Sequence, residues 1–198
     1  MEDVARIGGM SGSGGTAWGS NAVNGFINVI TRAAGETQGA LAPVGAGTQG
    51  RMAAARYGGA WEGGGHFRLY ARGSTRRETF NAAGTAMNDA ARDTRAGFRS
   101  DWGDASQEAT LQGDIYDTDI DQGAVLAPRR LSGFNLLGRL ARRTDAGASW
   151  RLQAYVDRTE RDQPGSVRDR LDTVDVEGQY APAPSGAHNW LFGAGYRY

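Results

Sequence analysis

The stretch Trp150-Arg151-Leu152-Gln153-Ala154-Tyr155-Val156-Asp157 decides the fold class, because apolar and more polar side chains alternate along it without interruption. Successive side chains of a β-strand point to opposite faces, so a period of two predicts a strand with one apolar and one wet face. Strands of this kind are typical of antiparallel sheets. We therefore start from an all-β interpretation.

The same alternation recurs on both sides of this stretch. Apolar Leu111, Gly113 and Ile115 are separated by Gln112 and Asp114. Together with the turn residues between them, these patterns predict strands at 40–48, 50–61, 66–78, 93–102, 107–117, 131–143, 148–159, 171–181 and 188–198.

The connections between these strands differ in length. Tight turns are predicted at Glu62–Gly65, Gly103–Ser106, Asp145–Gly147 and Pro182–Ala187, and longer loops at Thr79–Arg92, Thr118–Arg130 and Glu160–Arg170. Short turns alternating with long loops are typical of outer-membrane β-barrels. A soluble β-sandwich also alternates, but it gives no reason for this regular succession.

Composition excludes several classes of protein. Only 39% of the 198 residues are hydrophobic, and no apolar run approaches the roughly 20 residues of a membrane-spanning helix. A polar average (mean hydropathy −0.52) is compatible with a membrane barrel, where every second residue faces lipid. The 22 basic residues, all arginine, balance 22 acidic ones, so no basic face for nucleic acid is expected.

The first segment, residues 1–39, has a different texture from the rest. It contains a glycine-serine cluster and then a short strand predicted at Phe26–Thr31, directly after the turn signal Asn24-Gly25. Met1-Glu2-Asp3-Val4 does not resemble a secretory signal, which has an apolar core of about 7–15 residues. The expectation is a fragment of a longer exported protein.

The stretch Gly14-Gly15-Thr16-Ala17-Trp18-Gly19-Ser20-Asn21-Ala22-Val23-Asn24-Gly25-Phe26-Ile27-Asn28-Val29-Ile30-Thr31-Arg32 closely resembles the last plug segment of TonB-dependent outer-membrane receptors. In that family the segment stands immediately before the barrel. The stretches 57–59, 67–72 and 111–116 also look like the early barrel of iron-complex receptors. The positions that carry the plug motif are Gly14, Gly15, Trp18, Gly19, Asn21, Asn24, Gly25 and Asn28. We expect a structural role for them, with asparagines bonding backbone groups in irregular turns.

One departure from the family pattern concerns anchoring. Where the family usually has an arginine and a proline just before this segment, the chain has Ser11 and Ser13. The family's arginine is associated with charged contacts between plug and barrel, and a serine cannot form a bidentate ionic contact. We therefore do not expect Ser11 to provide the ionic contact between plug and barrel that the family's arginine provides.

The resemblance implies the following organisation and function. Residues 1–39 would be the C-terminal end of a plug domain, and residues 40–198 the N-terminal part of a transmembrane β-barrel of roughly 22 strands, of which about nine are here. The parent would be an active transporter in the outer membrane of a Gram-negative bacterium. It would take up an iron-siderophore complex or a similar scarce ligand, such as haem or cobalamin. Its partners would be the lipid bilayer and TonB, the latter through an upstream segment.

Motifs for other chemistry are weak. Gly12-Ser13-Gly14-Gly15-Thr16-Ala17 matches a loose dinucleotide loop, but a strand follows it instead of a helix, and a Walker loop would need lysine. No catalytic constellation and no cofactor site is expected, so the chain is not predicted to be an enzyme. Asp117, Asp119 and Asp121 alternate like the start of a calcium loop but lack its glycine and distal glutamate, so a solvated acidic loop is favoured.

Two other functions remain open at this point. A passive porin-like channel would need a closed, even set of strands, against about nine predicted. A soluble β-sandwich binding module would remain monomeric without detergent.

Overall fold

The computed structural model describes residues 3–12, 24–123 and 126–198. It is all-β with antiparallel pairing, and one 3-10 turn, η1 (Ala34–Thr37), is its one helical element in these ranges. No helix in the described ranges is long and apolar enough to cross a bilayer. The strands are β1 (Val4–Ser11), β2 (Gly25–Thr31), β3 (Gly39–Leu41), β4 (Val44–Gly47), β5 (Gly50–Ala60), β6 (His66–Arg76), β7 (Ala91–Gly103), β8 (Gln107–Gln122), β9 (Leu126–Arg143), β10 (Ser149–Gln163), β11 (Val167–Ala181) and β12 (Phe192–Arg197).

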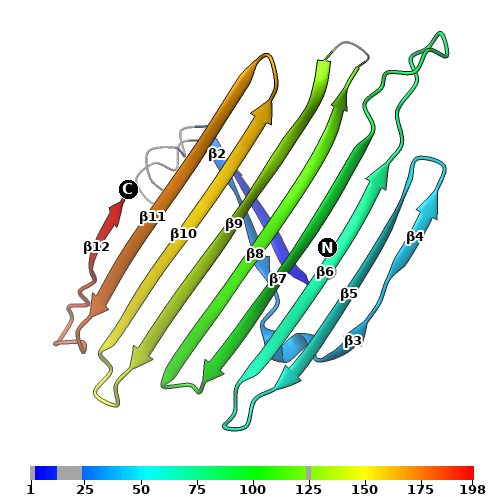
Figure 1. Cartoon of the computed structure of the whole chain (residues 1–198). Coiled ribbons are helices and arrows are strands. Elements are labelled where there is room, and N and C mark those ends of the chain that lie inside the picture. Colours follow the sequence, from blue (N-terminus) through cyan, green and yellow to red (C-terminus); the bar gives the residue numbers. More distant parts are fainter. Residues whose placement is uncertain (1–2, 13–23, 124–125) are drawn as a thin grey trace.

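The main sheet is a meander in which each strand pairs with its neighbours in the chain (Figure 1). Its ten strands run in the order β12-β11-β10-β9-β8-β7-β6-β5-β3, with β4 also paired to β5. The sheet is open, because β12 and β3 lie at its two ends and do not pair with each other. The all-β antiparallel prediction is thus confirmed, whereas a closed barrel is not formed by these strands.

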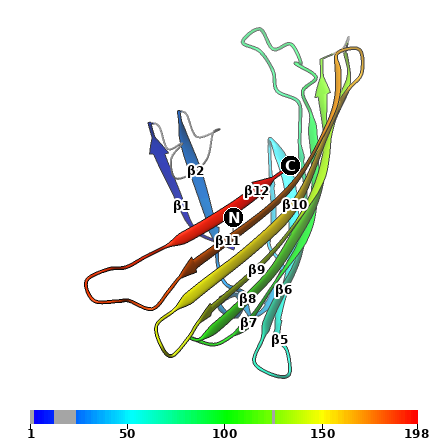
Figure 2. The same cartoon turned by 90° about the vertical axis from the view of Figure 1, so that its left-hand side faces the viewer.

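The sheet is twisted and curved, and the remaining two strands lie against its hollow side (Figure 2). β1 pairs antiparallel with β2, with Ser11 opposite Gly25 at one end. Gly25 has φ of 138°, and a Cβ there would collide with the carbonyl oxygen of Met10. We call this pair the β1–β2 ribbon and the hollow side of the main sheet the concave wall. The prediction of a strand at Phe26–Thr31 is confirmed, while its partner β1 was not predicted.

The first predicted barrel strand, 40–48, is divided into β3 and β4. Leu41 pairs with Arg56 and Val44 with Ala53, so the register against β5 is the same on both sides of Pro43. Proline has no N–H for the ladder and is tolerated in edge strands, which explains the local break. The Pro43 carbonyl still accepts a hydrogen bond from the amide of Ala54 at 2.9 Å.

Two of the three predicted long loops are wrong. Most of Thr118–Arg130 and of Glu160–Arg170 belongs to strands, because β8 continues to Gln122, β9 begins at Leu126, and β10 and β11 are joined by a turn at 164–166. The charged residues in these two ranges do not form solvated loops, because they face each other across neighbouring strands. Arg158 donates to Asp172 at 2.5 Å, and the Arg130 guanidinium is 2.7 Å from Asp117.

The other connections follow the predictions more closely. The turns at 61–65, 104–106 and 144–148 are short, and the loop at 77–90 is long. The predicted turn Pro182–Ala187 is longer than expected, because β12 begins at Phe192 and not at His188. The domain boundary predicted after residue 39 falls within β3, the first strand of the main sheet.

Candidate functional site: the concave wall and the ribbon docked on it

Cross-strand register assigns every strand residue to one of the two faces of the main sheet. Arg68 of β6, Arg99 of β7 and Gln112 of β8 are direct neighbours. The parallel row two residues away runs from Thr110 of β8 through Arg139 of β9 to Gln153 of β10 and Glu177 of β11. These side chains lie on the concave wall, because they line the spaces beneath the ribbon. The concave wall is therefore mainly polar and charged, with Leu137 of β9 as an apolar member.

The convex face carries the residues in between, and these are apolar. Leu152, for example, is 47% exposed and Ile115 61% exposed, although both are large and hydrophobic. No described element covers this face, and Ala34 is the single buried hydrophobic residue in the described ranges. The large exposed hydrophobic side chains on the convex face include Tyr57, Leu69, Trp102, Leu111, Ile115, Phe134, Leu136, Leu152, Val174, Val176, Tyr180, Phe192 and Tyr196. The apolar face predicted from the period-two pattern is confirmed.

The ribbon is anchored to the concave wall by an ion-pair cluster at its lower end. Asp3 accepts a hydrogen bond from Arg56 Nη1 at 2.6 Å, and its other carboxylate oxygen is 3.6 Å from Arg68 Nε. Arg68 is only 5% exposed, so its charge is largely desolvated and needs this partner. Arg99 donates to the hydroxyl of Thr31 at 3.0 Å, which fixes the end of β2.

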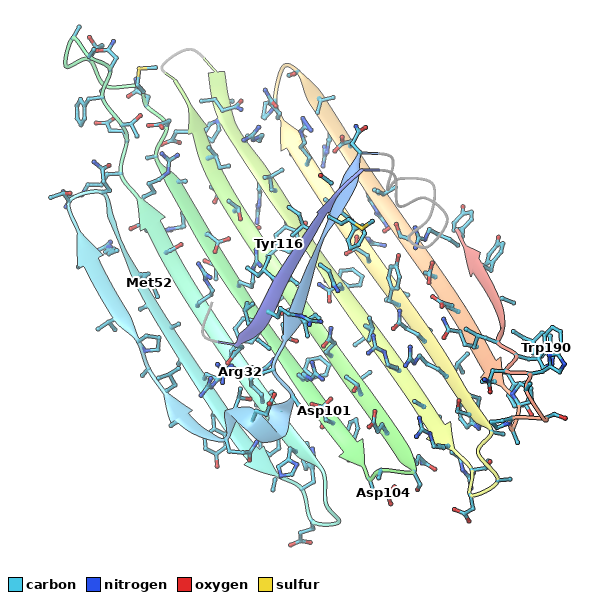
Figure 3. The ribbon with its side chains drawn as sticks, turned by 180° about the vertical axis from the view of Figure 1, so that it is seen from behind. Arg32, Met52, Asp101, Asp104, Tyr116 and Trp190 are labelled. Atoms are coloured by element: carbon cyan, nitrogen blue, oxygen red, sulfur yellow. The ribbon has the colours of Figure 1, made fainter. Side chains whose placement is uncertain are left out.

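The η1 turn continues this anchor into the main sheet. The Ala34 amide donates to Asp101 Oδ2 at 2.7 Å, and Arg68 Nη1 donates to the Arg32 carbonyl at 3.1 Å. Thr37 is buried and packs so closely that a Cβ at Gly58 would collide with its carbonyl oxygen. Figure 3 shows Arg32 and Asp101 close together on this side of the sheet. The segment between ribbon and wall is thus fixed by backbone as well as side-chain contacts.

Further along the wall, a second row of polar residues crosses the same strands. Arg72 of β6 lies directly opposite Arg95 of β7, which lies opposite Tyr116 of β8. The Arg95 guanidinium stacks over the Tyr116 ring at 5.6 Å from the ring centre. The Arg95 side chain has no hydrogen bond or ion pair with any described residue, and the Arg72 side chain forms a long ion pair with Asp93 at 3.9 Å.

Two cavities separate the ribbon from the wall. One, of about 450 Å³, is lined by Asp3 and Thr31 from the ribbon side and by wall residues of β5 to β9. Five arginines line it, against two aspartates: Arg56, Arg68, Arg72, Arg95 and Arg99 against Asp3 and Asp114. The other, of about 1130 Å³, lies towards β10–β12 and is lined by Asn28, Arg151 and Glu177 among others. The smaller cavity has the size of a small-molecule site, and the larger one slightly exceeds the usual range of about 300–1,000 Å³.

The predicted plug-motif residues are only partly visible. Gly14, Gly15, Trp18, Gly19 and Asn21 lie outside the described residues, as does Ser13. The backbone carbonyl of Asn24 accepts a hydrogen bond from the Gly12 amide at 3.1 Å, next to Gly25. Asn28 lies in a regular ladder opposite Gly8, not in an irregular turn, and lines the larger cavity.

The anchoring residues were not identified from sequence. Ser11 is exposed and pairs with Gly25 within the ribbon, so it makes no anchor. Asp3 supplies the ionic contact instead, from the opposite end of β1. The signal that could have found its partners is the alternation itself, which places Arg68, Tyr70 and Arg72 on one face of β6.

The acidic candidates for a metal site lie in a strand. Asp117, Asp119 and Asp121 belong to β8, so the prediction of a loop there is wrong, and Asp117 is paired with Arg130. An extended strand cannot wrap several carboxylates around one ion as a calcium loop does. Within the described ranges, no group of three His, Cys, Asp or Glu side chains could hold a metal ion.

Comparisons with known proteins found no match. No family model, no curated protein and no solved structure matched this chain. The functional argument therefore depends on the sequence and the geometry.

Proposed function

We propose that this chain is part of a TonB-dependent transporter of the outer membrane, made of the end of its plug and the first strands of its barrel. The observation that carries the proposal is the two-faced sheet, apolar and uncovered on its convex side and polar on its concave side. The ribbon held against the polar side by Asp3, Arg56 and Arg68 supports the plug assignment, because a plug would contact this side of a barrel wall.

The exposed convex face supports a lipid environment. Soluble monomers rarely expose a continuous apolar patch of more than a few hundred Å², because its hydration is unfavourable. Here apolar residues occupy the outward positions of seven consecutive strands, β5 to β11. In a bilayer that face would lie in acyl chains, and the charged pairs Arg130–Asp117 and Arg158–Asp172 would extend beyond them into the head-group region.

The presence of the ribbon on the concave wall favours a plugged barrel rather than an open channel. Barrels of about 22 strands enclose a lumen that is filled by a separate domain. The open edges of β12 and β3 are compatible with further strands completing such a barrel, because unpaired edges are not tolerated in hydrocarbon.

Substrate and energy source are proposed from the resemblance of residues 14–32 to the plug segment. The ligand would be an iron-siderophore complex, haem or cobalamin. Transport would be driven through TonB, which would contact a segment outside this chain.

The experiment uses the protein expressed from its complete gene in a Gram-negative host. We expect it in the outer-membrane fraction, soluble only in detergent, and we expect cells to accumulate one of three radiolabelled probes: a ferric siderophore, haem or cobalamin. A protonophore should abolish this accumulation. Accumulation that persists with the protonophore would favour a passive channel, and a detergent-free soluble monomer would favour the sandwich.

A further inference from the structure

Two pairs of arginines face each other across β6 and β7 on the concave wall. Arg68 is directly opposite Arg99, and four residues further along, Arg72 is directly opposite Arg95. Like charges directly opposite each other on one face of a sheet destabilise it. Each pair therefore needs an anionic partner.

The first pair has its anions within the chain. Asp3 approaches Arg68 at 3.6 Å, and Asp101 accepts two hydrogen bonds from Arg99 Nε at 2.8 and 3.1 Å. Arg68 and Arg99 are thus neutralised where the ribbon meets the wall.

The second pair is neutralised less completely, because one carboxylate contacts Arg72 and none contacts Arg95 among the described residues. Asp93 is 3.9 Å from Arg72 and receives a hydrogen bond from Thr118, while Arg95 stacks on Tyr116 and is exposed. The nearby carboxylate of Asp114 is hydrogen-bonded by the hydroxyl of Tyr70. Arg72 and Arg95 both line the cavity of about 450 Å³ under the ribbon.

We propose that Arg72, Arg95 and Tyr116 form a binding subsite for an anionic ligand that carries at least two carboxylate or phosphate oxygens. Neighbouring strands are about 4.8 Å apart, so two guanidinium groups on adjacent strands can hold two oxygens of one small polyanion. The Tyr116 ring lies 5.6 Å from the Arg95 guanidinium and helps to position it, while the Tyr116 hydroxyl donates to Thr159 at 3.5 Å. The ligand's anionic oxygens would do for Arg72 and Arg95 what Asp3 and Asp101 do for Arg68 and Arg99.

This inference rests on the proposed transport function, because it names the chemical class of ligand that the wall would take. Its test is equilibrium binding to the detergent-purified, full-length protein, which needs neither TonB nor an energised membrane. Failure of binding and failure of uptake are therefore separate results.

The probes are citrate, pyrophosphate and uncharged sucrose, titrated by calorimetry at low and high salt. We expect at least one of the two anions to bind, sucrose not to bind, and affinity to fall as salt rises. The tighter of the two anions identifies carboxylate or phosphate as the preferred chemistry. Sucrose binding as tightly as both anions, or no binding of either anion, would overturn the proposal.

Arg72→Gln and Arg95→Gln should each lower the affinity about tenfold, since each removes a charge-assisted hydrogen-bond donor. The matched control is Arg151→Gln, which removes the same charge from the concave wall but lines the other cavity. The affinity of the Arg151→Gln variant for the anion should stay within about twofold of that of the unmutated protein. Equal losses in all three variants would mean that the wall attracts anions without a defined site, and would overturn the proposal.

A second measurement uses the unmutated protein, so it tests the site even if the variants do not fold. Phenylglyoxal modifies accessible arginines, and peptide mass spectrometry reports the rate at each one. Bound anion should slow modification of Arg72 and Arg95 several-fold and leave Arg151 unchanged. Unchanged rates at Arg72 and Arg95 under saturating anion would contradict the site.

Discussion

At the scale of single residues, the face of the sheet on which a side chain lies decides whether a polar or an apolar residue is favoured there. Asn135 and Leu136 are neighbours on β9, yet Asn135 lies between Asp114 and Asp157 on the concave wall, while Leu136 is 41% exposed on the convex face. Adjacent positions therefore provide a matched test of the two environments.

We expect Leu136→Arg to destabilise the membrane-inserted protein by about 2–4 kcal/mol, the cost of an arginine facing lipid near the midplane. Asn135→Arg should be tolerated, because it adds a cation between two aspartates. The measurement is urea unfolding of the full-length protein in lipid vesicles. Equal losses of unfolding free energy at both positions would show that the convex face does not meet lipid.

The sequence was sufficient to predict on which face of the sheet a side chain lies, but not which distant segments contact each other. Alternation in Trp150–Asp157 and in 111–115 identified the apolar face correctly. Nothing local to Asp3 indicated that it would meet Arg56, 53 residues later, because that contact depends on where the ribbon docks. Most of the plug motif lies outside the described residues, so its role remains a prediction.

At the scale of elements, strand ends were harder to predict than strand existence. β8 to β11 extend further than predicted because their charged residues pair across strands; Arg170 of β11, for example, is 3.8 Å from Glu160 of β10. A charged residue at a strand end is compatible with either a loop or a cross-strand ion pair, and only the partner strand's register distinguishes them.

The docking of the ribbon depends on one carboxylate and can be tested by a double-mutant cycle. Asp3→Asn should lower the free energy of unfolding by about 2 kcal/mol, because it leaves Arg56 and Arg68 without an anionic partner. Arg56→Gln in the Asp3→Asn background should cost less than it does alone, giving a coupling of about 1 kcal/mol or more. Additive effects would mean that Asp3 does not anchor the ribbon. Asp145→Asn, in an exposed turn, serves as the control.

The loop at 77–90 should depend on pH through Asp89. Its carboxylate accepts hydrogen bonds from the Thr79 amide and hydroxyl and from Arg76. The hydrogen bond from the Thr79 amide, followed by those from Arg76 and the Thr79 hydroxyl, holds the pKa of Asp89 below its usual value. A lowered folded-state pKa means that this stabilisation is complete above the ordinary pKa of about 3.8 and is lost as pH falls through the lower, folded value. We expect the protection of amides in 77–90 from exchange, relative to an unstructured chain at the same pH, to fall only in that acidic range, and Asp89→Asn to lower this protection at every pH.

At the scale of the whole molecule, the loops at the two ends of the strands indicate which end of the proposed barrel would face the outside of the cell. The loop at 77–90 and the turn at 164–166 lie at one end of the sheet, and the short turns at 61–65, 104–106 and 144–148 lie at the other, near η1 (Figure 1). With two predicted long loops replaced by strand, loop length alone separates the ends less clearly than the sequence suggested. The cross-strand charged pairs also gather towards the end with the 77–90 loop, which supports an extracellular position for it.

Single cysteines can test this orientation, since the chain has no cysteine of its own. Ala86→Cys in the long loop and Ser166→Cys in the β10–β11 turn should react with a membrane-impermeant maleimide on intact cells that express the full-length protein. Ala146→Cys, in the turn between β9 and β10, should react only after the cells are lysed, because that turn would face the periplasm. All three positions lie between or beyond the strands, so the substitutions should leave the sheet intact, and labelling after lysis checks that each cysteine is accessible. Labelling of Ala146→Cys alone on intact cells would invert the orientation, and labelling of all three would argue that the sheet does not separate two compartments.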